Sequence, residues 1–96
     1  MEINELSKKA HEIALEKGFW EKKRPISECL MLIVTEVAEA CEADRMGDFD
    51  NFKEEIADTY IRLADLCGQL NIDIEDAIVT KMLKNKERPR LHGKNY

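Results

Sequence analysis

Four stretches of the 96-residue chain repeat apolar side chains every three or four positions, which is the period of an amphipathic helix. The first runs from about residue 3 to residue 17, and Gly18 is a stop signal. The second should begin near Pro25 to Ser27, because Arg24 precedes a proline and is biased away from helix. It extends to about Arg45. The first half of the chain is therefore predicted to form two helices joined by a short connector.

After a short turn at residues 46–48, the second half of the chain is also predicted to form two helices. A fourth helix should follow the N-cap residue Asp73 and end by Arg88, before Pro89. The inner apolar stripe of the second helix is expected to comprise Leu30, Ile33, Val34, Val37 and Cys41. That of the third helix comprises Phe52, Ile56, Thr59, Leu63, Leu66 and Leu70. No segment has the alternating pattern of a strand. We predict an all-α, four-helix antiparallel-type bundle, with residues 1–96 forming a single domain.

Composition narrows the functional classes. The net charge of -5 argues against nucleic-acid binding through a basic face. The longest apolar run, residues 29–34, is too short to span a bilayer, and no signal peptide is visible at the N-terminus. We therefore predict a cytoplasmic protein without membrane or nucleic-acid partners. A chain this small buries a modest fraction of its surface, which favours oligomerisation.

Two pairs of acids on the second and third helices carry the candidate chemistry. Glu36 and Glu39 are three residues apart, as are Glu55 and Asp58, so each pair shares a helix face. Glu39 and Glu55 each lie eight residues from Gly47, and Glu36 and Asp58 each lie eleven from it. An antiparallel hairpin centred on this glycine would bring the two pairs level. Four converging carboxylates repel one another and need a cation, and oxygen ligands suit Mg²⁺, with Mn²⁺ as a substitute.

A simpler interpretation is that these pairs lie on solvated faces of an acidic helical protein. Five other acids have no paired pattern and are expected to be surface charges: Glu42, Asp44, Asp48, Asp50 and Asp65. His11 has no partner by spacing and is interpreted as structural or incidental.

The spacing of these acids also resembles the signature of a known protein family. Thr35-Glu36-Val37-Ala38-Glu39, followed after a gap by Glu55-Ile56-Ala57-Asp58, resembles the signature of MazG-like all-α nucleoside triphosphate pyrophosphohydrolases. The opening of the last helix at residues 71–75, its ending at residues 81–89 and the tail His92-Gly93-Lys94 are similar to the family as well. One departure is Thr35, which stands where the family has the first of two adjacent acids.

The resemblance implies a MazG-like fold completed by oligomerisation, as a homodimer or tetramer. It implies magnesium-dependent hydrolysis of (deoxy)nucleoside triphosphates to monophosphate and pyrophosphate, a housecleaning activity on the nucleotide pool. Glu36, Glu39, Glu55 and Asp58 would be the catalytic and metal-binding residues. Water would attack the α-phosphorus, and pyrophosphate would leave.

Substrate contacts are expected on two other elements. Lys81, Asn85 and Arg88 follow one another at four- and three-residue steps and share a helix face that could bind phosphate oxygens. A solvated basic helix end is the simpler alternative. Trp20 could stack on a base, or it could be a lid on the core.

Two other functions share these features. A phosphoribosyl-ATP pyrophosphohydrolase would use the same acid scaffold with a different base and sugar pocket. A catalytically silent helical dimerisation or regulatory module would keep the fold without turnover.

Overall fold

The computed structural model describes residues 2–89, which contain four helices: α1 (Ile3–Glu16), α2 (Ile26–Arg45), α3 (Phe49–Gln69) and α4 (Ile74–Glu87). Within these residues there is no strand, so the all-α prediction is confirmed. The first, second and fourth helices begin and end within a residue or two of their expected positions, and the third begins directly after the expected turn. None of the four is long and apolar enough to cross a membrane.

Local signals set the helix ends. Gly18 and Gly47 follow α1 and α2 with φ of 87° and 73°, a left-handed conformation that glycine adopts without steric cost. The Asp48 carboxylate accepts a hydrogen bond from the backbone N–H of Asn51 at 3.1 Å and caps α3. Asp73 caps α4 in the same way, as predicted, by accepting from the N–H of Asp76 at 3.1 Å. The helix boundaries therefore follow from the backbone conformation and hydrogen bonds of residues close to them in the sequence.

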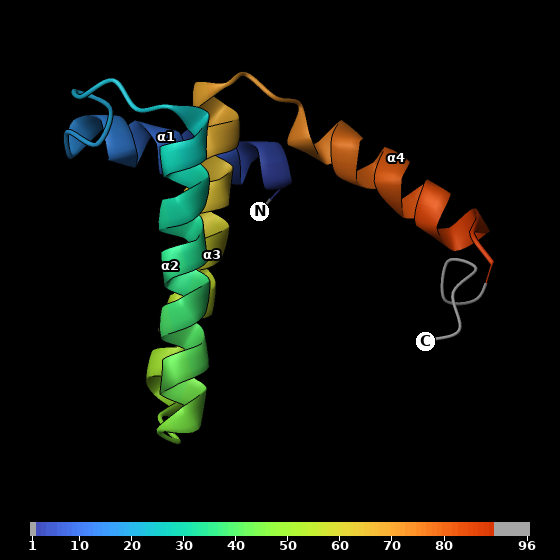
Figure 1. Ribbon diagram of the computed structural model, residues 1–96. Helices are drawn as coiled ribbons and strands as arrows, with labels where there is room; N and C mark the ends of the chain where they lie inside the picture. Colours follow the sequence, from blue (N-terminus) through green and yellow to red (C-terminus); the bar gives the residue numbers. More distant parts are fainter. Residues whose placement is uncertain (1, 90–96) are drawn as a thin grey trace.

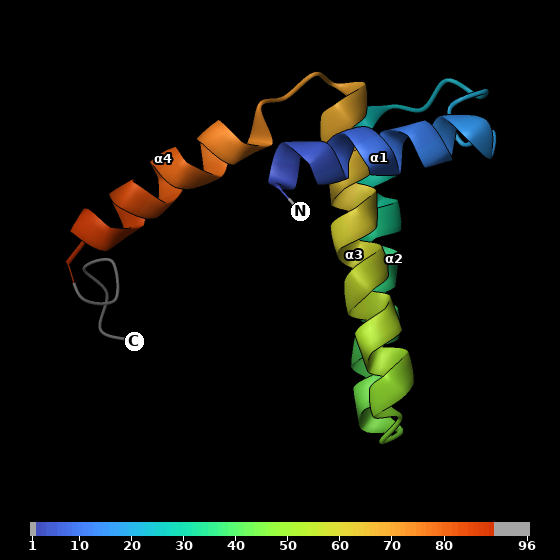
Figure 2. The same cartoon turned by 180° about the vertical axis from the view of Figure 1, so that it is seen from behind.

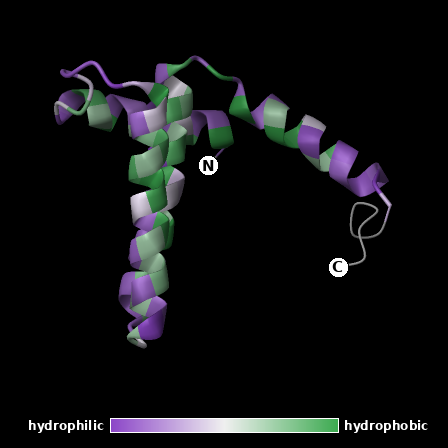
Figure 3. Cartoon of the chain, viewed as in Figure 1, coloured by the Kyte–Doolittle hydropathy of each residue, from purple (hydrophilic) through white to green (hydrophobic). Residues whose placement is uncertain are grey.

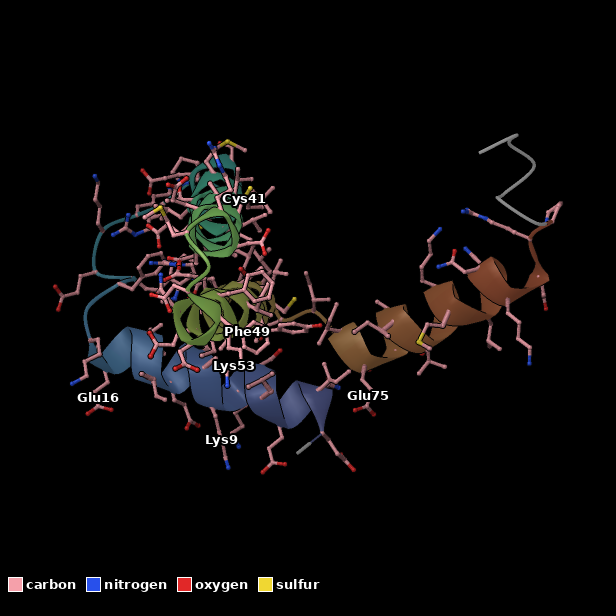
Figure 4. The ribbon with its side chains drawn as sticks, turned by 90° about the horizontal axis from the view of Figure 1, so that it is seen from below. Lys9, Glu16, Cys41, Phe49, Lys53 and Glu75 are labelled. Atoms are coloured by element: carbon pink, nitrogen blue, oxygen red, sulfur yellow. The ribbon has the colours of Figure 1, made fainter. Side chains whose placement is uncertain are left out.

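The α2 and α3 helices form a long antiparallel hairpin, and α1 lies across α3 near the open end of that hairpin (Figures 1 and 2). Gly68 marks the crossing. A Cβ atom at this position would lie 2.7 Å from Cβ of His11 and 3.0 Å from the carbonyl oxygen of Ser7. The absence of a side chain therefore lets the backbones of α1 and α3 approach closely. Lys9 and Glu16 lie on the opposite side of α1, which faces away from the hairpin (Figure 4).

The core sits where the hairpin, α1 and the connector meet. Cys29, Ile33 and Leu66 are its buried centre, and Phe19 and Trp20 of the connector pack against them. No described side chain is sealed completely from solvent. The core is thus small for a chain of this length.

The inner stripe predicted for α2 is wrong in part. Of its members, Ile33 is buried, whereas Leu30 is 43% and Val34 is 53% exposed. α2 instead turns Ile33 and two small residues, Ala40 and Ala43, toward α3. Small side chains let two helices approach closely, and the bulky stripe is left on the other side. In Figure 3 the hydrophobic, green residues of the hairpin gather in its upper part, whereas its lower end near the turn is mainly hydrophilic and purple.

The fourth helix does not close a bundle within one chain. Its start is tied to α1, because the Asn4 amide nitrogen donates to Asp73 at 2.9 Å and the Glu75 N–H donates to the Asn4 side-chain oxygen at 3.1 Å. Beyond this point α4 stands clear of the other helices (Figures 1 and 4), and it has no buried residue. Its apolar residues Val79 and Met82 are exposed. Within residues 2–89 the predicted antiparallel bundle is therefore incomplete, because α4 does not pack along the other three helices.

Candidate active site

Three of the four predicted acids come together midway along the α2–α3 hairpin. Glu36 and Glu39 extend from α2, and Glu55 extends from α3. One carboxylate oxygen from each lies within 4.8 Å of those of the other two. The hairpin that turns at Gly47 thus brings together acids that are up to nineteen residues apart in the sequence. We call Glu36, Glu39 and Glu55 the acid group.

Glu55 lies at the centre of the acid group without a compensating charge. Its Oε2 atom is buried and has no hydrogen-bond partner among residues 2–89. Proton sharing with Glu39 and then Glu36, together with burial, raises the pKa of Glu55 from 4.5 to about 7. A buried carboxylate oxygen without a donor is rare in folded proteins. This arrangement fits a divalent cation, which takes oxygen ligands and would remove the repulsion.

Asp58 lies outside the acid group but beside it. Its side chain is exposed, one turn after Glu55 on α3. With Glu36 it lines a cavity of about 380 Å³ that opens between α1, the connector and the hairpin. The sequence placed Asp58 opposite Glu36, and both residues do face this cavity. A second hollow of about 350 Å³ adjoins the group on the other side, between Glu39, Glu55 and the turn.

Thr35, at the position where the family has another acid, contributes nothing to the group. Its side chain is exposed, and its hydroxyl donates to the carbonyl oxygen of Met31 at 3.1 Å, one turn back on the same helix. The departure from the family pattern therefore leaves the three converging carboxylates intact.

Arg62 is a site residue that the sequence analysis missed. Its Nε–H donates to Oε1 of Glu36 at 2.9 Å, and the Glu36 side chain is only 12% exposed. The guanidinium also lies 5.8 Å from the ring centroid of Phe19. Arg62 thus supplies one positive charge to the edge of the acid group, and among residues 2–89 no cationic side chain forms an ion pair with Glu55.

The 380 Å³ cavity extends from the acid group toward α1. Five apolar and five charged residues line it, and three of the charged residues lie on α3. The lining comprises Ala10, Ile13, Ala14, Lys17, Phe19, Glu36, Asp58, Ile61, Arg62 and Asp65. A space of this size between apolar walls and a few polar groups is typical of a small-molecule site.

Asp65 is buried, so its assignment as a surface charge is wrong. Oδ1 of Asp65 accepts two hydrogen bonds, from Nδ1 of His11 and from Nε1 of Trp20, each at 2.9 Å. Because an ionised carboxylate can only accept, His11 carries its proton on Nδ1. His11 is therefore not incidental, since it helps to hold this buried carboxylate. The α1–α3 crossing at Gly68 brings the two side chains into contact.

Trp20 packs as a lid on the core rather than as an open stacking platform. Its indole packs against the buried centre and meets the Phe19 ring edge-on at a centroid distance of 4.9 Å. Its N–H is already used by Asp65. The aromatic residue that lines the 380 Å³ cavity is Phe19. Base stacking by Trp20 stays a prediction.

The structure does not bring the predicted phosphate-binding residues to the acids within one chain. Lys81 and Asn85 are exposed on the part of α4 that stands clear of the hairpin, and Arg88 is exposed directly after the end of α4. None of them lines either hollow beside the acid group. The tail His92-Gly93-Lys94 lies outside the described residues.

A spacing signal could have found the missed residues. Glu55, Asp58, Arg62 and Asp65 follow at steps of three, four and three, so they form one polar stripe along α3. The apolar stripe predicted for α3 runs beside it in the sequence, but of that stripe only Leu66 is buried, and Ile56, Leu63 and Leu70 are exposed. A polar stripe that continues for three turns next to an apolar stripe indicates a functional face.

A known family model matches the part of the sequence that contains most of this site. The family model for the MazG nucleotide pyrophosphohydrolase domain matches residues 25–92, more than two thirds of the chain. Comparison with curated proteins and with solved structures found no significant match. The matched region contains the acid group, Asp58, Arg62 and Asp65 and excludes α1, which supplies one wall of the cavity. The chain therefore belongs to the family of MazG nucleotide pyrophosphohydrolase domains.

Proposed function

We propose that this chain hydrolyses nucleoside triphosphates to monophosphate and pyrophosphate in a magnesium-dependent reaction. The observation that carries the proposal is the acid group, in which the buried Oε2 of Glu55 has no donor while two other carboxylates lie against it. Such a group is costly unless a cation occupies it in the working state. Housecleaning of the nucleotide pool is the role that we infer for this activity.

The ligands that we assign to Mg²⁺, with Mn²⁺ as a substitute, are Glu36, Glu39 and Glu55, together with Asp58 from the next turn. When bound, the cation would neutralise phosphate oxygens and favour ionisation of water at neutral pH. Arg62 holds Glu36 in position through its 2.9 Å hydrogen bond and adds positive charge next to the phosphates. A carboxylate oxygen facing the substrate would accept a hydrogen bond from the attacking water and direct it at the α-phosphorus. The apolar walls of the adjoining cavity would exclude other water from the nucleoside.

The test is pyrophosphate release from a panel of ribo- and deoxyribonucleoside triphosphates, with and without Mg²⁺. Glu55→Gln removes the charge of the central acid, and Glu54→Gln is a matched control on an exposed neighbour. We expect Glu55→Gln to lower turnover at least about 100-fold, because metal-dependent charge stabilisation contributes several kcal/mol to such reactions. Glu54→Gln should stay close to wild type. Equal activity in the two variants, or release without Mg²⁺, would contradict the assignment.

We also propose that the working protein is a homodimer or tetramer. The accessible surface of the chain is 7664 Å², whereas a compact monomer of 11.1 kDa exposes about 5,700 Å². Exposed apolar residues on α2 and α4 account for part of the excess: Leu30, Met31, Val34, Val37, Val79, Met82 and Leu83. Association through these faces would bury surface on the scale of a stable interface. Sedimentation as a monomer at micromolar concentration would contradict the proposal.

Assembly is also the route by which α4 would serve the site. Lys81, Asn85 and Arg88 lie away from the acids of their own chain, so we propose that they bind phosphate oxygens at a site that a neighbouring chain helps to form. Lys81→Ala and Arg88→Ala should raise KM for the triphosphate, and unchanged values would contradict this role. An acidic chain with net charge -5 is not expected to bind nucleic acid.

A further inference from the structure

Asp65 is an acceptor held at the inner end of the cavity that begins at the acid group. Its side chain is 10% exposed and lines the 380 Å³ space. Two donors from different elements, the His11 ring on α1 and the Trp20 indole in the connector, meet on the same oxygen, Oδ1. These two bonds fix the plane of the carboxylate.

The second oxygen of Asp65 remains available. No residue between 2 and 89 donates a hydrogen bond to Oδ2, and this atom is not sealed from solvent in the way that Oε2 of Glu55 is. An ionised carboxylate has about four acceptor positions, of which His11 and Trp20 use two. The carboxylate therefore has acceptor capacity left for a ligand in the cavity that it lines.

Asp65 lines the same 380 Å³ space as Asp58 and as Glu36 of the acid group. Asp58 and Asp65 are seven residues apart on the same face of α3, which corresponds to about 10 Å along the helix axis. Between them the wall is formed by Ile61 and by Ala14 of α1. With the phosphates at the acid end, the sugar would lie along this wall and the base would reach Asp65.

We propose that Asp65 is a specificity-determining residue that accepts a hydrogen bond from the amino group of the base. This inference rests on the proposed function, because it places the phosphates at the acid group. An amino group donates to a carboxylate, whereas the carbonyl oxygen at the same position of uracil or hypoxanthine would be repelled by it. The enzyme therefore prefers cytosine over uracil and adenine over hypoxanthine, by roughly tenfold to hundredfold.

An asparagine at this position should reverse the preference for a geometric reason. In Asp65→Asn the amide oxygen must take the place of Oδ1, because the His11 and Trp20 groups are donors. The amide nitrogen then occupies the position of Oδ2 and presents donors to the cavity. A donor there suits a carbonyl oxygen and conflicts with an amino group.

The test compares deoxycytidine and deoxyuridine α,β-imidotriphosphates, which cannot be cleaved at the α–β bond, by titration calorimetry with Mg²⁺. Wild type should bind the cytosine analogue at least about tenfold more tightly. Asp65→Asn should abolish or invert this ratio, and the exposed control Asp50→Asn should keep it. A purely structural Asp65 would change both affinities together and leave the ratio alone. An unchanged ratio in Asp65→Asn, equal binding by wild type, or no binding of either analogue would overturn the inference.

If Asp65→Asn does not fold, a change in the ligand tests the same inference on the wild-type protein. The pyrimidin-2-one analogue has neither an amino group nor an oxygen at that position, so wild type should bind it at least about tenfold more weakly than the cytosine analogue. Equal binding would overturn the inference. Pyrophosphate release separates the two proposals: equal release from dCTP and dUTP would refute base selection and keep the activity. A cytosine preference in binding without pyrophosphate release from any nucleotide would refute the activity and keep the base selection.

Discussion

Lowering the pH from 8 to 6 should weaken Mg²⁺ binding to the acid group by about tenfold. The pKa of Glu55 is raised to about 7, chiefly because its carboxyl shares a proton with Glu39 and Glu36. The cation needs the ionised form, so it has to displace that proton below pH 7. One proton competes with the cation at a pKa of about 7. Relative to the fully ionised site, the apparent dissociation constant for Mg²⁺ is therefore about elevenfold higher at pH 6 and only about a tenth higher at pH 8.

The same pKa determines how the stability of the metal-free protein depends on pH. The folded chain binds more protons than the unfolded chain between the ordinary pKa of 4.5 and about 7. The free energy of unfolding contributed by Glu55 is therefore largest at or below the lower value and decreases as the pH rises through this window. Saturating Mg²⁺ should oppose that decrease, because the cation binds the ionised folded form.

Titration calorimetry in two buffers of different ionisation enthalpy measures both the affinity and the released proton. A proton should leave on Mg²⁺ binding at pH 6, and almost none should leave at pH 8. Glu55→Gln should bind weakly without this pH dependence, whereas Glu54→Gln should behave as wild type. An affinity that is the same at both pH values, without proton release at pH 6, would refute the reasoning about the acid group.

Three further substitutions test the framework around the site. Gly68→Ala should lower the free energy of unfolding by about 1–3 kcal/mol, because its Cβ would lie 2.7 Å from Cβ of His11; a melting temperature equal to wild type would contradict the close crossing. Leu66→Ala should cost about 2–4 kcal/mol in chemical denaturation, since it removes a buried side chain from a small core. Arg62→Gln should tighten Mg²⁺ binding several-fold by removing a competing positive charge next to Glu36, while Arg62→Lys should stay near wild type. Weaker binding in Arg62→Gln would contradict this prediction and show that losing the hydrogen bond that holds Glu36 outweighs losing the charge.

The parts of the fold that depend on neighbouring residues could be predicted from the sequence. Gly18, Gly47, Asp48 and Asp73 end or begin helices through their own backbone conformation or side-chain hydrogen bonds, which need no distant partner. The convergence of Glu39 and Glu55 was also predictable. A hairpin with a short turn permits only antiparallel pairing, so counting outward from Gly47 gives the register.

The predictions that failed depend on how helices are packed. Val34 belongs to an apolar stripe, but the period of the sequence does not say which of two apolar faces a neighbouring helix will cover. Ala40 and Ala43 decided this, because small residues allow α3 to approach more closely. The position of α4 was undetermined for a related reason, since helix periodicity does not say which surface a helix packs against, and α4 has no buried residue in the described part of the chain.

The sequence alone therefore determined the four helices, their order and the pairing of acids across the hairpin, because each depends on local conformation or on one short turn. Only the tertiary structure decided that Asp65 is buried against His11 and Trp20 and that Arg62 binds Glu36. These contacts join residues 26 to 54 positions apart. They exist because Gly68 lets α1 cross α3 closely and because α2 and α3 pack along their whole length, and neither packing geometry follows from periodicity.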